Sequence, residues 1–136
     1  MGYFDTVLKE YGESLGFSDM TRRADGLCSF YYKNTNLTIS MQTDQKEERV
    51  VLLSQIGGVD PDDLDERIID LLKANYFWSE TNGATLSIDP EGGGVFVAMQ
   101  LLVHMLDAES FSKVIDSFQE VALNWAQKIA ANNRIE

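Results

Sequence analysis

Apolar residues in the first part of the chain recur every three or four positions. That spacing places them on one stripe of a helix over about residues 3–15. Gly16 is expected to end the helix, because glycine readily adopts the left-handed backbone found after helices. The stripe consists of Phe4, Val7, Leu8, Tyr11 and Leu15.

Three strand-like runs follow, joined by the short polar links that hairpins require. They cover residues 27–32, 37–43 and 49–56. In the second run Leu37, Ile39 and Met41 alternate with polar residues, which predicts one buried and one wet face. The third run is apolar on both faces over residues 50–53, which predicts a central strand covered on both sides.

A second helix is predicted after the third strand. Asp60 suits its cap and Pro61 its first position. The helix runs to about Ala74, and Asn75 is expected to be a left-handed cap. Its apolar stripe consists of Leu64, Ile68, Leu71 and Leu72.

Two more strands and a long helix complete the pattern. The strands cover about residues 85–89 and 95–101 and pair across the turn-forming cluster at residues 90–94. The closing helix is predicted to begin near an Asp107 cap, and its period is the strongest in the chain. Its apolar positions are Phe111, Val114, Ile115, Phe118, Val121, Ala122, Trp125 and Ile129.

The order of elements is therefore α-β-β-β-α-β-β-α. This order predicts an α+β fold in which three helices pack against an antiparallel sheet. The chain has 136 residues and shows no repeat or interdomain linker. We expect residues 1–136 to form a single domain.

Charge argues against nucleic acid as a partner. The chain has 22 acidic and 11 basic residues, a formal net charge of −11, so its field repels phosphate backbones and anionic membranes. No apolar run reaches the roughly 18 residues of a membrane helix, and the start lacks the features of a signal peptide. The single cysteine, Cys28, cannot form an intramolecular disulfide, which favours a reducing compartment. We expect a cytoplasmic protein that does not insert into membranes.

Reactive side chains do not form a catalytic or metal-binding pattern. His104 is the only histidine, and a partly buried structural role explains it as well as a catalytic one. The glycines at 92–94 lie between strands, whereas a phosphate-binding loop opens a helix. The acidic residues between 60 and 70 lack the ligand spacing of a calcium loop; they solvate a helix or suit a basic polypeptide. We expect no enzyme activity, cofactor or metal.

Apolar residues exceed what one small core needs. Over residues 95–106 both alternate sets of side chains are largely apolar. Either helices and a partner subunit cover the sheet, or part of the sheet stays open as a groove for a polypeptide.

Three segments carry a family resemblance: Leu71-Leu72-Lys73-Ala74-Asn75, the strand entry over residues 81–90, and the amphipathic helix over residues 111–125. They resemble the class I chaperones of bacterial type III secretion, the Tir chaperone-like family. The segment Leu101-Leu102-Val103 departs from the family, which often has a proline after the last strand.

The resemblance implies a homodimer in the bacterial cytoplasm that binds the amino-terminal chaperone-binding segment of a secreted effector. It would keep the effector competent for secretion without ATP hydrolysis. The residues we expect to bind the effector are Phe4, Leu8, Phe30, Tyr32, Met41, Phe96 and Met99. The residues we expect at the dimer interface are Leu64, Ile68, Leu71, Leu72 and Trp78.

Two other functions are alternatives. A regulatory protein of the same fold would sequester a secretion-linked regulator in place of an effector. An enzyme with a small-molecule site is the second alternative, but the chain shows no constellation of base, nucleophile and oxyanion donor.

Overall fold

The computed structural model describes residues 2–16, 27–31, 37–43, 48–89, 91 and 93–133. Within these residues the predicted order of elements and the α+β class are confirmed. The main elements are α1 (Tyr3–Ser14), β1 (Leu27–Tyr31), β2 (Thr38–Thr43), β3 (Arg49–Gly58), α2 (Leu64–Asn75), β4 (Thr85–Ile88), β5 (Gly94–Leu102) and α3 (Ala108–Asn133). The short 3-10 helices are η1 (Pro61–Asp63), η2 (Tyr76–Trp78) and η3 (Val103–Met105).

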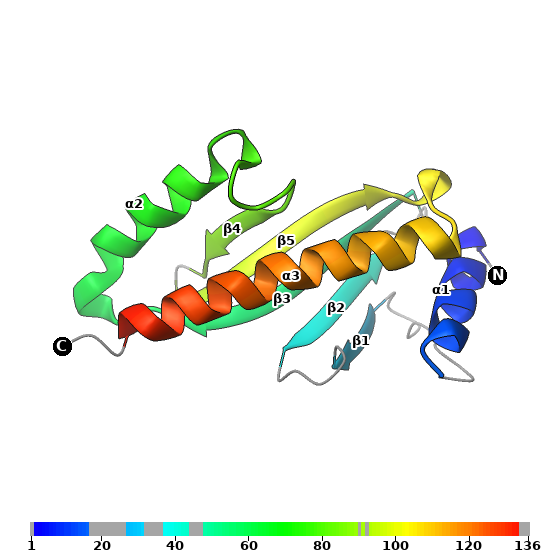
Figure 1. The fold of residues 1–136 in the computed structure, drawn as a ribbon, viewed down its shortest axis with the longest axis horizontal. Helices are drawn as coiled ribbons and strands as arrows, with labels where there is room; N and C mark the ends of the chain where they lie inside the picture. The colour runs from blue at the N-terminus through cyan, green and yellow to red at the C-terminus, as the bar shows by residue number, and fades with distance from the viewer. Residues whose placement is uncertain are drawn as a thin grey trace.

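The strands form one antiparallel sheet in the order β1-β2-β3-β5-β4. The central pair, β3 and β5, is separated in sequence by α2 and β4, which lie at one side of the sheet. Helix α3 runs along one face, α1 packs against the start of α3, and α2 lies beside β4 at the other end (Figure 1). One face of the sheet is thus covered by α1 and α3.

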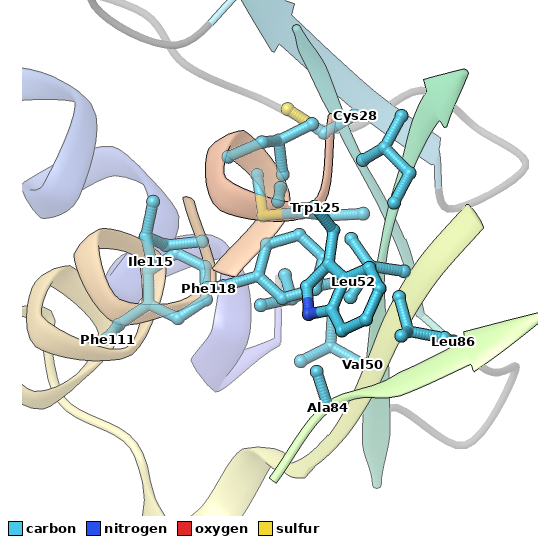
Figure 2. Packing of buried hydrophobic residues seen from close by; sticks show 14 of the residues in the cluster. Cys28, Val50, Leu52, Ala84, Leu86, Phe111, Ile115, Phe118 and Trp125 are labelled. Atoms are coloured by element: carbon cyan, nitrogen blue, oxygen red, sulfur yellow. The ribbon is translucent and has the colours of Figure 1, made fainter. Parts of the chain in front are cut away.

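The core lies between this covered face and the two helices. Phe111 of α3 packs edge to face against Phe4 and Tyr11 of α1, with ring centroids 5.6 and 5.1 Å apart. Figure 2 shows Trp125 of α3 in the same buried cluster as Leu52 of β3. Every apolar position predicted for the closing helix is buried or partly buried against this core.

Strand β3 is central, as predicted, but in the single chain only one of its faces is covered. Val50 and Leu52 are fully buried beneath the helices, whereas Val51 and Leu53 are 37% and 38% exposed. The expectation that both faces are covered is therefore wrong for this chain alone. The reason is that α1 and α3 both pack on the same side of the sheet.

The ends of α2 differ in part from the prediction. Asp60 does cap the first turn, because its Oδ1 accepts a hydrogen bond of 2.9 Å from the backbone N–H of Asp62, but this turn is the 3-10 helix η1. Asn75 is not a left-handed cap, since its φ is −73° and its ψ is −14°. Its side chain instead bonds to β4: Nδ2 donates to the Leu86 carbonyl at 3.0 Å and Oδ1 accepts from the Leu86 N–H at 2.9 Å.

Helix α3 begins at the predicted Asp107 cap. The backbone N–H of Ser110 donates to Asp107 Oδ1 at 2.7 Å, and the N–H of Asp107 donates to Ser110 Oγ at 2.9 Å. These reciprocal bonds satisfy donors that a helix start leaves unpaired. Hydrogen bonds from Ser110, with the backbone N–H first, lower the pKa of the Asp107 carboxyl below its ordinary value of 3.8.

Candidate protein-binding surfaces

The face of the sheet opposite α1 and α3 carries apolar side chains at its centre. We call it the open sheet face and define it by the outward-pointing residues of β2, β3 and β5. Its exposed apolar members are Val51, Leu53 and Leu102, and Leu53 pairs with Ala98 and Ser40 across the sheet. The full set is Thr38, Ser40, Gln42, Val51, Leu53, Gln55, Phe96, Ala98, Gln100 and Leu102.

A depression lies on the open sheet face beside the bulge in β3. The register with β5 shifts between Gln55 and Gly57, and such a bulge bends its strand locally. The depression has a volume of about 520 Å³ and is lined by Thr38, Ser40, Leu53, Gln55, Gly57 and Phe96. Its mixed apolar and amide lining suits both the side chains and the backbone of a polypeptide.

A second exposed apolar surface covers the outer side of α2 and the following 3-10 helix. We call it the α2 patch, and its members are Ile68, Ile69, Leu72, Tyr76, Phe77 and Trp78. Their exposed fractions run from 38% for Ile68 to 76% for Phe77. Large apolar side chains gathered at one exposed place are characteristic of a protein-binding surface.

The last three members, Tyr76, Phe77 and Trp78, form an aromatic knuckle. Phe77 has φ 50° and Trp78 has φ 55°, a left-handed backbone that costs about 1–2 kcal/mol for each residue with a side chain. The rings of Tyr76 and Phe77 lie edge to face, 4.7 Å apart. The fold therefore holds large aromatic side chains in solvent through a strained backbone, and such strain is common at functional sites.

The residues predicted to bind the effector do not lie together on one surface of the structure. Phe96 lies on the open sheet face and is half-buried, whereas Phe30 and Met99 are partly buried on the helix side of the sheet. Tyr32 lies outside the described residues. The remaining three are core residues that offer no surface in this conformation: Phe4, Leu8 and Met41.

The residues predicted at the dimer interface divide between two sides of α2. Ile68, Leu72 and Trp78 belong to the exposed α2 patch. Leu71 is buried and Leu64 is half-buried on the inner side of the helix. The α2 patch also contains Ile69, Tyr76 and Phe77, which are not in the predicted set, although their apolar character next to the stripe was a visible signal.

Two side chains with reactive chemistry, His104 and Cys28, lie among the described residues. His104 is exposed, not partly buried as expected. Cys28 is buried, and burial raises the pKa of its thiol, which disfavours the reactive thiolate. The described residues contain no group of three or more His, Cys, Asp or Glu side chains placed to hold a metal ion. Among those residues, no helix is long and apolar enough to cross a membrane.

The described residues thus form an α+β domain with an open apolar sheet face and an exposed apolar helix. The chain belongs to the Tir chaperone protein (CesT) family, whose model matches residues 6–126. This match confirms the resemblance to class I type III secretion chaperones. Among curated proteins, none matches the sequence.

Solved structures share the fold at low sequence identity. A chain of the ExsC–ExsE complex is 20% identical, with a TM-score of 0.77 over 93% of this chain and 92% of that chain. A chain of the HopA1–SchA chaperone–effector complex is 15% identical, with a TM-score of 0.69 over 93% and 91%. A chain of the Yersinia pestis type III secretion chaperone SycH, solved with a fragment of YscM2, is 14% identical, with a TM-score of 0.70 over 89% and 98%.

Proposed function

We propose that this protein is a cytoplasmic class I type III secretion chaperone. It binds the amino-terminal chaperone-binding segment of a secreted effector and keeps that segment competent for secretion, without ATP hydrolysis. The observation that carries the proposal is the open sheet face, whose central apolar residues Val51, Leu53 and Leu102 are exposed in the single chain. Family membership supports it, because the family is one of chaperones.

Binding uses apolar contacts and strand pairing together. Side chains of the effector segment pack on the open sheet face and enter the depression beside Phe96. The edge strand β1 offers backbone groups to which an extended segment adds a strand. Ordering the segment costs conformational entropy, so both kinds of contact are needed over a long stretch.

We further propose a homodimer formed through the α2 patch. A two-fold axis beside Ile69 would pair the α2 helices of two copies antiparallel. At 1.5 Å per residue, this register places Asp65 of one copy opposite Lys73 of the other. Neither residue forms an ion pair within the described part of the chain. Asp65 precedes Ile69 by four residues and Leu72 by seven, so it lies on the same outer side of the helix as these two side chains. Apolar contacts and charge therefore favour the same arrangement.

The function is tested by recovering the partner and then removing the surface. The tagged protein is purified from its native cells under secretion-inducing conditions, and co-purified proteins are identified and trimmed to the minimal bound segment. Recovery of a secreted protein through its amino-terminal region supports the proposal. Recovery of a regulator alone favours the regulatory alternative and contradicts the chaperone assignment.

A matched pair of variants then links the partner to the open sheet face. Leu53→Asp is expected to weaken binding of the minimal segment at least tenfold, because it places a charge at the centre of the apolar surface. Ala130→Asp, at an exposed position on α3, is the control and should bind normally. Equal affinity of the two variants would remove the open sheet face from the binding site.

A further inference from the structure

The sheet carries a single charged residue, although the chain is rich in charge. The chain has 22 acidic and 11 basic residues, yet within the five strands as described Arg49 is the only charged one. It is the first residue of β3 and pairs with Leu102 at the end of β5, so it lies at the margin of the sheet. The centre of the open sheet face is therefore neutral. Acidic residues gather instead on η1 and α2, at Asp62, Asp63, Asp65, Glu66 and Asp70.

The other polar side chains of this face are amides and hydroxyls. The face continues onto the edge strands, because Ser29 of β1 pairs with Ser40 and Ser87 of β4 pairs with Phe96. The hydroxyl oxygens of Ser29 and Ser40 are 3.0 Å apart. Amides and hydroxyls donate and accept hydrogen bonds without carrying charge. The set on this face is Ser29, Thr38, Ser40, Gln42, Gln55, Thr85, Ser87 and Gln100.

The depression beside the bulge of β3 has the same neutral character. None of the described residues that line its volume of about 520 Å³ is charged. Two of them, Gln55 and Phe96, meet above Gly94: a Cβ added to this glycine would lie 2.9 Å from Nε2 of Gln55 and 3.1 Å from Cε1 of Phe96. The amide and the ring therefore occupy space that a side chain at position 94 would take. Together they offer an apolar wall and a hydrogen-bonding group to a side chain that enters.

This chemistry disfavours charge in whatever rests on the face. A charged side chain buried there loses its hydration and meets no opposite charge, which is unfavourable for either sign. An uncharged polar side chain finds amide and hydroxyl partners, and an apolar one finds Val51 and Leu53. The net charge of −11 acts from a distance and is screened beyond about 8 Å at physiological salt. Local contacts therefore decide which side chains bind.

We infer that the open sheet face selects an uncharged stretch of the effector segment, in which the facing side chains are apolar or bear an amide or hydroxyl. The face rejects facing side chains of either charge, although the protein as a whole is acidic. This inference rests on the proposed function and names the chemistry of the segment that the face accepts. Gln55 and Phe96 are the specificity-determining residues at the depression.

A peptide selection tests the inference without knowledge of the effector. Random phage-displayed peptides of about 12 residues, long enough to cross the sheet as extended strands, are selected on the parent protein. Clones that also bind the Leu53→Asp variant are discarded, so those that remain depend on the open sheet face. We expect aspartate, glutamate, lysine and arginine to be depleted at least about twofold at alternate positions, relative to the unselected library.

The outcomes of the selection separate the inference from the proposed function. Enrichment of lysine and arginine would overturn the inference, and the open sheet face would still be a peptide-binding surface. Failure to find any peptide that depends on Leu53 would contradict both. A lower molecular mass of the Leu53→Asp variant in solution would assign the face to a second copy of the chain and would also overturn the inference.

Opposite charges at one position give a second measurement. Gln55→Glu and Gln55→Lys should both weaken binding of a selected peptide about tenfold, because each places an unpaired charge at the depression. Effects of opposite direction would show that attraction between charges governs binding, and would contradict the inference. Lys113→Glu, at a 76%-exposed side chain on α3, is the control and should bind like the parent. The affinity of the parent should change less than about twofold between about 50 and 500 mM NaCl.

Discussion

Asn75 is a single side chain that joins α2 to the edge of the sheet. Its amide makes two hydrogen bonds to the backbone of Leu86 in β4, at 3.0 and 2.9 Å. The backbone of an edge strand has few other partners, so these bonds substitute for a neighbouring strand. Their loss would leave partly buried polar groups without partners.

We therefore expect Asn75→Ala to lower the free energy of unfolding by about 1–3 kcal/mol, measured by urea denaturation. Ser29→Ala is the control, because it removes a hydrogen bond to Ser40 that is exposed to solvent, and it should cost less than about 0.5 kcal/mol. Equal losses in the two variants would show that the hydrogen bonds of Asn75 contribute no more to the free energy of unfolding than an exposed hydrogen bond does.

Asp107 gives the start of α3 a dependence on pH. Hydrogen bonds from Ser110 lower the pKa of this carboxyl in the folded state. A lowered folded pKa means that its contribution to stability is present above 3.8 and is lost as pH falls from there through the folded pKa. Asp107→Asn should be less stable than the parent at pH 7, and the difference should shrink below pH 3.8. A difference that stays constant between pH 7 and pH 3 would contradict this.

Residue type alone predicted the cap at Asp107. It did not predict the contact that Asn75 makes or the left-handed backbone after α2. An aspartate just before the apolar period of a helix is a local signal, and Asp107 was recognised as a cap on that ground. Asn75 was expected to be left-handed because asparagine tolerates that backbone, but its side chain is engaged by β4, a contact between distant parts of the chain. The left-handed conformation falls instead on Phe77 and Trp78, where no propensity would place it.

At the scale of elements, neighbouring residues of β3 face opposite sides of the sheet. Leu52 is fully buried and Leu53 is 38% exposed. Leu52→Ala should lower the free energy of unfolding by about 2–5 kcal/mol, because it leaves a cavity in the core. Leu53→Ala should cost less than about 1 kcal/mol and should weaken binding of the effector segment. Denaturation and binding measured on both variants check this, and similar stability losses would show that both faces of β3 are covered.

The outer side of α2 should control association. Ile68→Asp combined with Leu72→Asp should give monomers in analytical ultracentrifugation with an unchanged circular dichroism spectrum, because both side chains are exposed in the single chain. An unchanged dimer mass would remove these residues from the interface.

Charge reversal checks the antiparallel register of the same pair. Asp65→Lys and Lys73→Asp should each weaken the dimer, and the two together should restore much of the loss. Absence of rescue would leave the helix in the interface and exclude this register.

At the scale of the whole molecule, association of two copies should make the thermal stability depend on protein concentration. If the α2 patch is buried between two copies, a tenfold rise in protein concentration adds about 1.4 kcal/mol and raises Tm by a few degrees. The variant with Ile68→Asp and Leu72→Asp should show no such dependence in calorimetry. A Tm independent of concentration in the parent protein would argue against the dimer.

The periodicity of the sequence predicted the order of the elements, but it predicted only part of their arrangement in space. The helix over residues 111–125 and the alternation in residues 37–43 were both predicted, because each is a local pattern. Alternation says which side chains share a face, and it does not say which face the helices cover. For that reason Met41 was assigned to the effector, whereas the structure buries it with Ile39, and Leu53 was not singled out.

The insertion of α2 and β4 between the central strands β3 and β5 also affects how the domain opens. Helix α2 and strand β4 lie between β3 and β5 in the sequence, and β4 is at the edge of the sheet, so β4 with α2 can detach while β3 and β5 stay paired. Hydrogen exchange would then show two cooperative units, with the central strands protected to the global free energy and α2 exchanging through a local opening. If two copies associate through α2, this helix is the part of the free monomer that exchanges fastest. Dimer formation would then slow hydrogen exchange more in α2 than in any other element.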